Sequence, residues 1–304
     1  MAGEFVFTVI VPTFNRAASL ERLLASFALT RDLDQVPSEI IVVNNGSTDR
    51  TVEVCGAIKH STYPFKLEVL DESRRGKASA LNRGLTAARG QYIMVIDDDV
   101  VVDPDLVNRH LECYRSNDFA AVQGRILPGR DLTGRPADPA RLREYNIPMI
   151  DYGDQFREIR GLTGTNMSFK RQVFETIGSF DPRLGPGASG FSEDTEFSLR
   201  VRKAGFKIGY TPHAVVYHEL DPARFGSGYN RMVEYRKGQS RSIYRRDSIL
   251  LKLLPNLVVN CLRYGFYRIL GRTQKAYKTE GRIMKCWGQL VGTLDSRSNR
   301  RVAA

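Results

Sequence analysis

The segment Tyr92-Ile-Met-Val-Ile-Asp-Asp-Asp99 decides the fold, because a short apolar run ends directly in three carboxylates. Such a run is typical of a buried strand in a parallel sheet. Similar runs at 5–11, 39–43 and 66–70 alternate with stretches of helical periodicity, such as 77–88. Strands that alternate with helices predict an α/β fold with a mostly parallel central sheet and helices on both faces.

Beyond Asp99 this alternation loosens. The pattern predicts helices at 104–116, 171–177 and 194–204, and strands near 120–123 and 214–217. The stretch from Gly124 to Pro139, rich in Pro, Gly and Arg, is expected to be a loop or lid. Ser19 is the expected N-cap of the first helix, whose apolar positions are Leu20, Leu23, Leu24 and Phe27.

The chain has the composition of a soluble globular protein, with 42% hydrophobic and 26% charged residues among 304. Its four cysteines form no CxxC pair, so neither a disulfide framework nor a zinc ribbon is indicated. The N-terminus lacks a basic segment followed by an apolar core, and no uncharged apolar stretch reaches about 18 residues. Secretion and a membrane span are therefore not expected.

Positive charge is concentrated in the C-terminal quarter of the chain. Residues 229–304 hold 17 Lys and Arg against 4 Asp and Glu, a balance of +13, although the formal net charge of the whole chain is only +11. Residues 1–228 therefore carry −2. This asymmetry predicts a nearly neutral domain at 1–228 and a basic amphipathic helical extension at 229–304 that meets an anionic surface.

Asp97, Asp98 and Asp99 are the strongest candidates for a functional site. Ligands of parallel α/β sheets bind at the carboxyl ends of the strands. Three adjacent carboxylates repel one another unless a cation is present, and oxygen ligands favour Mg²⁺ or Mn²⁺. Because alternate residues of an extended segment point the same way, Asp97 and Asp99 are expected to face one ligand, such as a metal-bound nucleotide diphosphate. A solvated turn or a helix N-terminus is the alternative interpretation.

Polar turns also follow the first two predicted strands, at Pro12-Thr13-Phe14-Asn15-Arg16 and Asn44-Asn45-Gly46-Ser47. A third turn, Arg74-Arg75-Gly76-Lys77, places cations at the start of a predicted helix, and both features favour phosphate. Each turn alone is ordinary turn chemistry. Their convergence on the edge that holds Asp97–Asp99 predicts a site for a base, a ribose and phosphates.

Two further candidates lie downstream. Glu193 and Asp194 open a predicted helix, where acidic residues either stabilise the helix dipole without further function or supply a general base for a hydroxyl. His218 ends an apolar strand beside Glu219, where a histidine is either structural or a metal ligand.

Eight motifs in this order resemble the inverting glycosyltransferases of family 2, which have the GT-A fold. They are Val9-Ile-Val-Pro-Thr-Phe-Asn-Arg16, Val43-Asn-Asn-Gly-Ser-Thr-Asp49, Gly76-Lys-Ala-Ser-Ala-Leu-Asn82, Asp97-Asp-Asp99, Gly164-Thr-Asn-Met-Ser168, Gly178-Ser-Phe-Asp181, Glu193-Asp194 and Tyr217-His218. The resemblance covers about residues 5–220. It implies a nucleotide-binding half at about 5–123 and an acceptor half at about 161–220.

The resemblance also implies roles for single residues. Flanking the nucleotide are Thr13, Arg16 and Asn45, with Pro12 and Asn15 of the same turn beside them and Lys77 nearby. The donor and its metal are held by a DxD-type motif formed by Asp97, Asp98 and Asp99, and His218 completes the metal shell. Asp194 is implied as the base, with Glu193 as the second candidate. Many members carry aspartate at the position of Asn45, so this chain departs from the family at a residue that often contacts the base.

The implied reaction is a metal-dependent single displacement that inverts the sugar. The donor is a nucleotide-diphosphate sugar, with UDP as the expected nucleotide, and the acceptor is a hydroxyl of a glycan or lipid-linked molecule in polysaccharide or glycolipid synthesis. Nucleotidyl transfer is an alternative, but it favours a glycine-rich phosphate loop after the first strand, where this chain has Pro-Thr-Phe-Asn-Arg. A non-catalytic protein that uses the basic extension to bind membrane or nucleic acid is the other alternative.

The basic extension predicts attachment to a membrane surface. Its uncharged run Leu253–Leu262 is too short to span a bilayer, but apolar residues at helical spacing, interfacial aromatics and cations together are typical of a helix that lies in the interface. No recognised nucleic-acid-binding motif is present. The expected location is therefore cytoplasmic and peripheral, on the inner face of the cell membrane. The alternative is a helical subdomain that packs its leucines on the rest of the protein.

Overall fold

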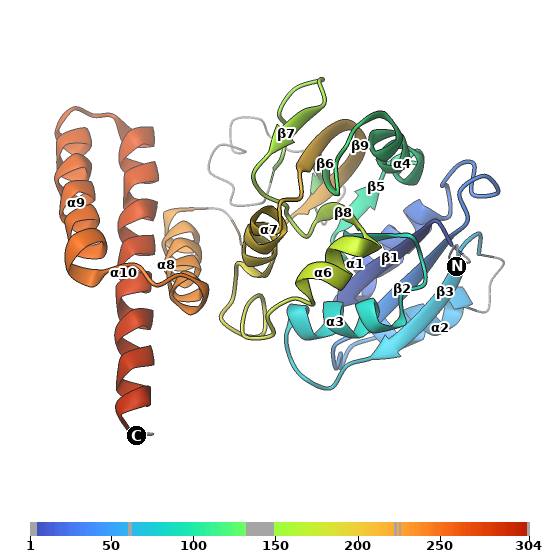
Figure 1. Cartoon of the computed structure of the whole chain (residues 1–304), viewed down its shortest axis with the longest axis horizontal. Helices are drawn as coiled ribbons and strands as arrows, with labels where there is room; N and C mark the ends of the chain where they lie inside the picture. The colour runs from blue at the N-terminus through green and yellow to red at the C-terminus, as the bar shows by residue number, and fades with distance from the viewer. Residues whose placement is uncertain (1–4, 60–62, 132–148, 222–223, 225, 303–304) are drawn as a thin grey trace. The chain divides into compact units, whose positions relative to one another are not determined.

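The computed structural model describes residues 5–59, 63–131, 149–221, 224 and 226–302, which divide into two compact units (Figure 1). The first unit comprises the described residues up to 131 together with 149–182 and 193–220. The second comprises 183–192 and the described residues from 221 onward. The loop that leads into Glu193 thus belongs to the same unit as the C-terminal helices.

The first unit is built on a nine-stranded sheet with the order β3-β2-β1-β4-β8-β6-β9-β5, and β7 pairs with β9 beside this path. The four strands from β3 to β4 are parallel, whereas β8 runs antiparallel between β4 and β6. The strands are β1 Phe7–Thr13, β2 Ser38–Asn44, β3 Lys66–Asp71, β4 Tyr92–Ile96, β5 Val100–Val102, β6 Ala121–Asp131, β7 Arg157–Ile159, β8 Asn166–Lys170 and β9 Ile208–Leu220.

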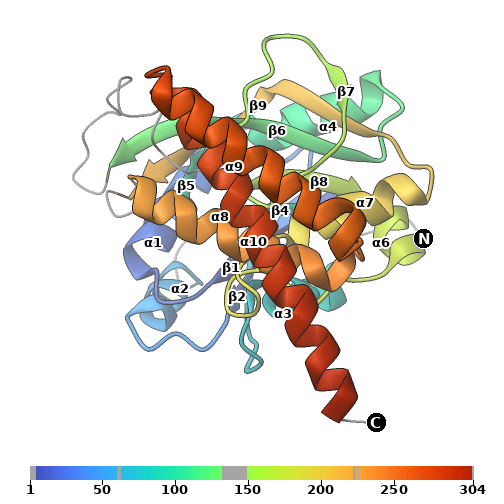
Figure 2. The same ribbon diagram turned by 90° about the vertical axis from the view of Figure 1, so that its left-hand side faces the viewer.

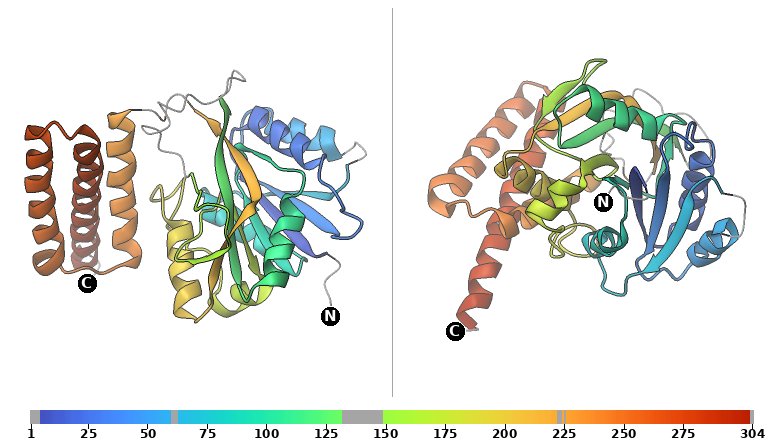
Figure 3. Two further views of the ribbon diagram at one scale, coloured as in Figure 1. Left: turned by 90° about the horizontal axis from the view of Figure 1, so that it is seen from above. Right: turned by 45° about the vertical axis from the view of Figure 1, so that its right-hand side comes forward.

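Helices cover both faces of this sheet (Figure 3). They are α1 Ala17–Phe27, α2 Thr51–Lys59, α3 Lys77–Ala87, α4 Leu106–Ser116, α6 Arg171–Ile177 and α7 Glu193–Lys203. Apolar residues of α1 and α4 form one core cluster with the sheet, and those of α3, α6 and α7 form the other. The predicted apolar positions Leu20, Leu23, Leu24 and Phe27 are all fully buried. The predicted α/β architecture is confirmed.

The expectation of a loop from Gly124 is wrong for residues 124–131, which continue β6 beside β9, with register shifts between Gly124 and Arg125 and between Pro128 and Asp131. Residues 132–139 of that expected loop lie outside the described residues. The glycines that suggested a loop permit close approach within the sheet instead. A Cβ at Gly124 would lie 2.2 Å from Nδ2 of Asn166, and one at Gly129 would lie 2.9 Å from the carbonyl oxygen of His218.

The expected N-cap of α1 is also wrong. The helix begins at Ala17, whose backbone N–H donates to Oδ2 of Asp49 at 3.0 Å. A carboxylate from the following βα turn therefore satisfies the helix end that Ser19 was expected to cap. The Ser19 hydroxyl instead donates to Oε2 of Glu219 at 2.8 Å, which ties α1 to the end of β9.

In the second unit, α10 lies between α8 and α9 (Figures 2 and 3). The elements are α8 Ser227–Tyr244, a π-helical turn η2 Ile249–Leu253, α9 Leu254–Ile269 and α10 Thr273–Val302. A Cβ at Gly238 of α8 would lie 2.1 Å from the carbonyl oxygen of Lys285, so the backbones of α8 and α10 touch. By length and composition, Ile249–Ile269 is apolar enough to cross a membrane. A search for uncharged runs misses it because Lys252, Arg263 and Arg268 interrupt the sequence.

Candidate active site

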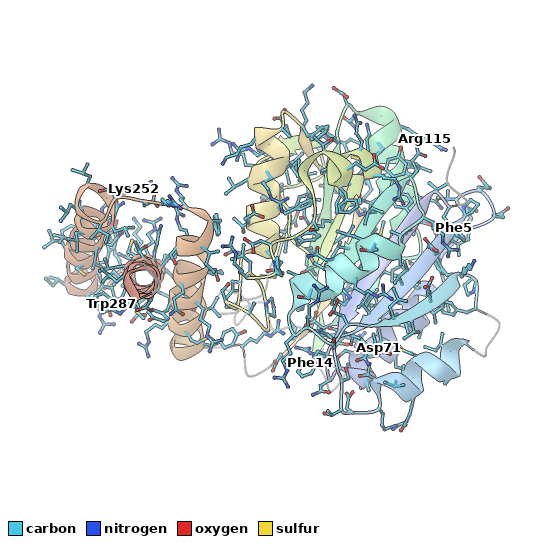
Figure 4. All side chains as sticks on the ribbon, turned by 60° about the horizontal axis from the view of Figure 1, so that its bottom comes forward. Phe5, Phe14, Asp71, Arg115, Lys252 and Trp287 are labelled. Carbon is cyan, nitrogen blue, oxygen red and sulfur yellow. The ribbon has the colours of Figure 1, made fainter. Side chains whose placement is uncertain are left out.

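The turns after β1 and β2 are locked together at the carboxyl edge of the sheet. Asn15, with φ of +52°, accepts at Oδ1 a hydrogen bond from the backbone N–H of Thr48 at 2.7 Å. The backbone N–H of Asn15 donates to Oγ of Ser47 at 3.0 Å. Phe14 follows β1 at this edge (Figure 4), and Cζ of the Arg75 guanidinium lies over its ring, 5.8 Å from the ring centroid. The expected convergence of the first three polar turns is therefore observed.

Asn45 clamps the third turn to this edge. Its Nδ2 donates to the carbonyl oxygens of Glu72 and Arg74, both at 2.8 Å, and its Oδ1 accepts from the N–H of Gly76 at 2.8 Å. The side chain is buried. Its contact with a nucleotide stays a prediction, but these bonds explain why an amide suits this position. A carboxylate would meet two carbonyl oxygens without a proton to donate.

Replacing Asn45 by aspartate is expected to lower the free energy of unfolding by at least about 2 kcal/mol, because two buried carbonyls lose their donor. Urea denaturation measures the change. Asn108→Asp is the matched control, because the hydrogen bonds that Nδ2 of Asn108 donates, to the carbonyl oxygen of Arg31 at 3.2 Å and to Oδ2 of Asp32 at 3.5 Å, are exposed. Equal stability of the two variants would show that the hydrogen bonds of Asn45 do not stabilise the fold.

Lys77, the first residue of α3, joins the acidic residues of two other elements. Its ammonium forms an ion pair with Oδ1 of Asp97, which directly follows β4, and lies 3.6 Å from Oε1 of Glu193 at the start of α7. The other oxygen of Asp97 accepts from the Thr165 hydroxyl at 2.9 Å. Gly164 leaves room for this arrangement, since a Cβ there would lie 3.1 Å from Nζ of Lys77. One cation, whose side chain is 16% exposed, thus pairs with both Asp97 and Glu193.

The cluster shifts the pKa values of its members in opposite directions. Burial alone lowers the pKa of Lys77, but Asp97 and Glu193 outweigh it and raise this pKa above its usual range. Burial raises the pKa of Asp97, yet the Lys77 ammonium holds it below its ordinary value. Burial raises the pKa of Glu193 to about 7 against the opposing effect of Lys77. Acidic groups with separated pKa values in one site are typical of acid–base chemistry.

Asp194 is the more exposed of the two acidic residues that open α7, since Glu193 is only 6% exposed. Its Oδ1 accepts from the backbone N–H of Thr195 at 2.6 Å. Burial raises the pKa of Asp194, while Lys77 and the backbone amides of Thr195 and Gly164 oppose this effect. The position suits a carboxylate that must meet an incoming hydroxyl.

Asp99 contacts different side chains from those that contact Asp97. Its Oδ2 accepts from Nη1 of Arg16 at 3.2 Å, and its Oδ1 lies 3.5 Å from Nε2 of His218. The Nδ1–H of His218 donates to the carbonyl oxygen of Glu219 at 2.8 Å, so in the neutral ring Nε2 keeps its lone pair toward Asp99. Burial and the charge of Asp99 raise the pKa of Asp98 to about 7, although Arg16 opposes this shift.

The predicted metal ligands are only partly brought together. Across the part of the chain that the structure describes, no group of three or more His, Cys, Asp or Glu has a metal-binding arrangement. Asp99 and His218 form a pair of suitable donors, whereas Asp97 is turned to Lys77 and Thr165. That Asp97 and Asp99 face one ligand therefore stays a prediction. In this structure the Lys77 ammonium forms an ion pair with Asp97.

Two contributors were missed from the sequence. Thr165 binds Asp97 through its hydroxyl, and Gly164 both makes room for Lys77 and presents its amide near Asp194. Both belong to the motif Gly164-Thr-Asn-Met-Ser168, which carries part of the family resemblance but for whose single residues the sequence predicts no role. Pro12 lies within β1, where it pairs with Val43, so only its backbone position relates it to the site.

Residues 8–178, more than half of the chain, match the profile described as Glycosyl transferase family 2. The chain belongs to this family. Its curated relatives include poly-beta-1,6-N-acetyl-D-glucosamine synthase of Staphylococcus epidermidis, which is 26% identical over 243 residues, or 78% of this chain and 55% of that protein. The probable glycosyltransferase YdaM of Bacillus subtilis is 26% identical over 271 residues, covering 86% of this chain and 61% of that protein. The chain thus spans little more than half the length of these relatives.

Solved structures of the same fold include the mannosyltransferase PcManGT of Pyrobaculum calidifontis in complex with GDP-Man and Mn²⁺. It has a TM-score of 0.63 and 19% identity, over 95% of this chain and 87% of that one. TarS 1–349 of S. aureus in complex with UDP-GlcNAc has a TM-score of 0.52 and 15% identity, over 96% of this chain and 92% of that one. These likenesses confirm the GT-A type of fold.

Proposed function

We propose that this chain transfers a sugar from a nucleotide-diphosphate sugar to an acceptor hydroxyl, with inversion at the anomeric carbon. The observation that carries the proposal is the cluster in which Lys77 joins Asp97, at the end of β4, to Glu193, the neighbour of Asp194. These contacts bring the acidic end of β4 and the acidic start of α7 into one site, which supports a donor diphosphate and a general base lying side by side. Membership of family 2 supports the same reaction, as do the nucleotide sugars in similar solved structures.

In the proposed mechanism the acceptor hydroxyl attacks the anomeric carbon from the face opposite the nucleoside diphosphate. Asp194 takes the hydroxyl proton while the new carbon–oxygen bond forms and the bond to the diphosphate oxygen breaks. A single displacement inverts the configuration and needs no covalent sugar intermediate, unlike the mechanism of retaining glycosidases. The raised pKa of Asp194 makes it a stronger base than an ordinary aspartate.

Asp99 and His218 are the proposed ligands of a divalent cation, Mg²⁺ or Mn²⁺, with Asp97 as the third candidate. The fit rests on the donor set, because Nε2 of His218 lies 3.5 Å from Oδ1 of Asp99 while Nδ1 is engaged by the carbonyl oxygen of Glu219. When bound, the cation supplies Lewis-acid stabilisation of the leaving diphosphate. Mn²⁺ is present with the donor in the similar PcManGT structure.

The donor nucleotide is proposed to lie along the edge formed by Thr13, Asn15, Arg16 and Asn45, with Asp98 toward its ribose and Lys77 near its phosphates. UDP remains the expected nucleotide. The proposed acceptor is a glycan or lipid-linked hydroxyl, and the synthase relatives make polysaccharide synthesis the proposed context.

A thermal melt tests the binding half of this proposal. UDP-, GDP- and dTDP-sugars are each added with and without Mn²⁺, and at least one is expected to raise the melting temperature only when Mn²⁺ is present. The same nucleosides without phosphates are the control. A protein that no nucleotide sugar stabilises under either condition would contradict the proposal.

A further inference from the structure

The second unit buries several uncharged polar side chains and exposes many of its large apolar ones. Asn260 is the buried side chain of α9, and the interior of the unit also contains Asn230, Ser240, Thr279 and Gln289. By contrast, Leu251 is 86% exposed, Leu262 70% and Ile269 85%. Large apolar residues exposed beside buried amides are unusual in a water-soluble helical domain, where a contiguous exposed apolar surface marks an interaction site.

The exposed residues form one continuous surface, here called the α9 outer face. It consists of Leu250, Leu251, Leu254, Val258, Val259, Leu262, Phe266, Ile269 and Leu270. The positions 254, 258, 262 and 266 repeat every four residues, so they share one side of the helix. Asn260 lies on the opposite side, turned into the unit, where its Nδ2 donates to the carbonyl oxygen of Asn256 at 2.7 Å.

Exposed cations border this apolar surface. At about 100° per residue, Arg263 and Arg268 fall on opposite margins of the α9 outer face. Further exposed cations precede η2 and follow α9 at Arg245, Arg246, Arg272, Lys275 and Lys278. Acidic residues in the same segment are few, and Asp247 is buried among Lys252, Arg245 and Gln289. The charge around the α9 outer face is therefore complementary to an anionic surface.

We propose that the α9 outer face inserts into the interface of an anionic lipid bilayer, with α9 parallel to the membrane plane. An apolar face with cations at its margins is the composition of an interfacial helix. The proposal concerns the second unit alone and does not depend on the reaction proposed above.

The packing of α10 argues against a membrane-spanning α9. The 21 residues Ile249–Ile269 would be about 31 Å long, enough to cross a hydrocarbon core of about 30 Å. However, α10 runs back along α9 (Figure 1) and carries Lys275, Lys278, Glu280 and Arg282 in its first turns. A spanning α9 would draw these charges into the hydrocarbon, where they are expensive. An in-plane α9 leaves them in water or among headgroups.

Co-sedimentation of the full chain with vesicles tests the proposal. Binding to phosphatidylcholine vesicles that contain phosphatidylglycerol is expected, with much weaker binding to phosphatidylcholine alone and release in high salt. Leu262→Glu is expected to weaken binding at least tenfold, because it places a carboxylate in the apolar face. Arg263→Gln is expected to weaken it roughly fivefold, the effect of one cation near an anionic surface.

Leu29→Glu is the matched control, because Leu29 is 69% exposed in the first unit and Leu262 is 70% exposed. This control is expected to bind like the unchanged protein. Equal binding to neutral and anionic vesicles, or equal binding of the two glutamate variants, would overturn the proposal. Binding that resists high salt and alkaline extraction would show a spanning helix instead. A dimer in sedimentation velocity that Leu262→Glu dissociates, without vesicle binding, would assign the face to a second copy of the chain.

Discussion

Asp194→Asn is expected to leave the protein folded and able to bind its donor, while turnover falls by about 10²–10⁴-fold. The amide has the shape of the carboxylate but cannot take the proton of the acceptor hydroxyl. The rate of nucleoside-diphosphate release, with water as the acceptor, measures turnover, and calorimetry measures donor affinity. If the variant kept more than about a tenth of the activity, Glu193→Gln would become the test of the base.

The pH dependence of turnover gives the same assignment a second test. A base is active when deprotonated, so activity is expected above the pKa of Asp194 and is lost as the pH falls through it. Burial raises this pKa above that of an ordinary aspartate. The acid limb of the pH–rate profile, where turnover falls with falling pH, should therefore lie above pH 3.8. Glu196→Gln is the control, because Glu196 lies on the same first turn of α7 but pairs with Arg200 at 2.8 Å. The control is expected to keep both the rate and the acid limb.

Asp99→Ala is expected to weaken Mn²⁺-dependent donor binding by more than about 100-fold. Loss of a metal-bound carboxylate should exceed the 10- to 100-fold effect typical of changes in residues that only support the ligands. Titration calorimetry of UDP with and without Mn²⁺ measures the loss. The affinity for UDP without Mn²⁺ should change little. The difference between the two titrations therefore gives the contribution of Mn²⁺ to UDP binding.

Two further variants separate metal binding from folding. Asp99→Asn keeps the volume of the side chain and an oxygen for Arg16, so it should fold even if the alanine variant does not. Asp118→Ala removes an exposed carboxylate that pairs with Lys207 at 3.3 Å, and it should bind like the unchanged protein. Unchanged Mn²⁺-dependent affinity in both Asp99 variants would remove Asp99 from the metal site.

The sequence was sufficient to place the ends of the strands, because each buried strand is a short apolar run followed by polar residues. Asp97–Asp99 and the turns at Asn15 and Asn45 were therefore found at the correct edge of the sheet. Predictions from local sequence patterns were wrong where a segment distant in the sequence supplies the contact. The glycines of β6 suggested a loop, yet they let β8 and β9 approach closely. Ser19 suggested a cap, yet Asp49 supplies it from another turn.

The contacts between side chains within the site could not be predicted for the same reason. The position of Lys77 beside Asp97 and Glu193 depends on α3, β4 and α7 meeting in space. Thr165 reaches Asp97 only because β8 enters the sheet antiparallel beside β4. The amphipathic pattern of α9 was visible in the sequence, but which side faces α10 was not. The buried Asn260 and the exposed leucines are known only from the packing.

The central claim is that the chain transfers glycosyl groups, and the phosphorus products of donor turnover test it most directly. The protein is incubated with Mn²⁺ and the nucleotide sugar that stabilises it best, and ³¹P NMR follows the products. Glycosyl transfer, to an acceptor or to water, predicts accumulation of the nucleoside diphosphate, at a rate that Asp194→Asn lowers. Nucleotidyl transfer from the same donor would break the P–O–P bond and release the sugar 1-phosphate instead. A sugar 1-phosphate as the product would therefore contradict the account of the site given above.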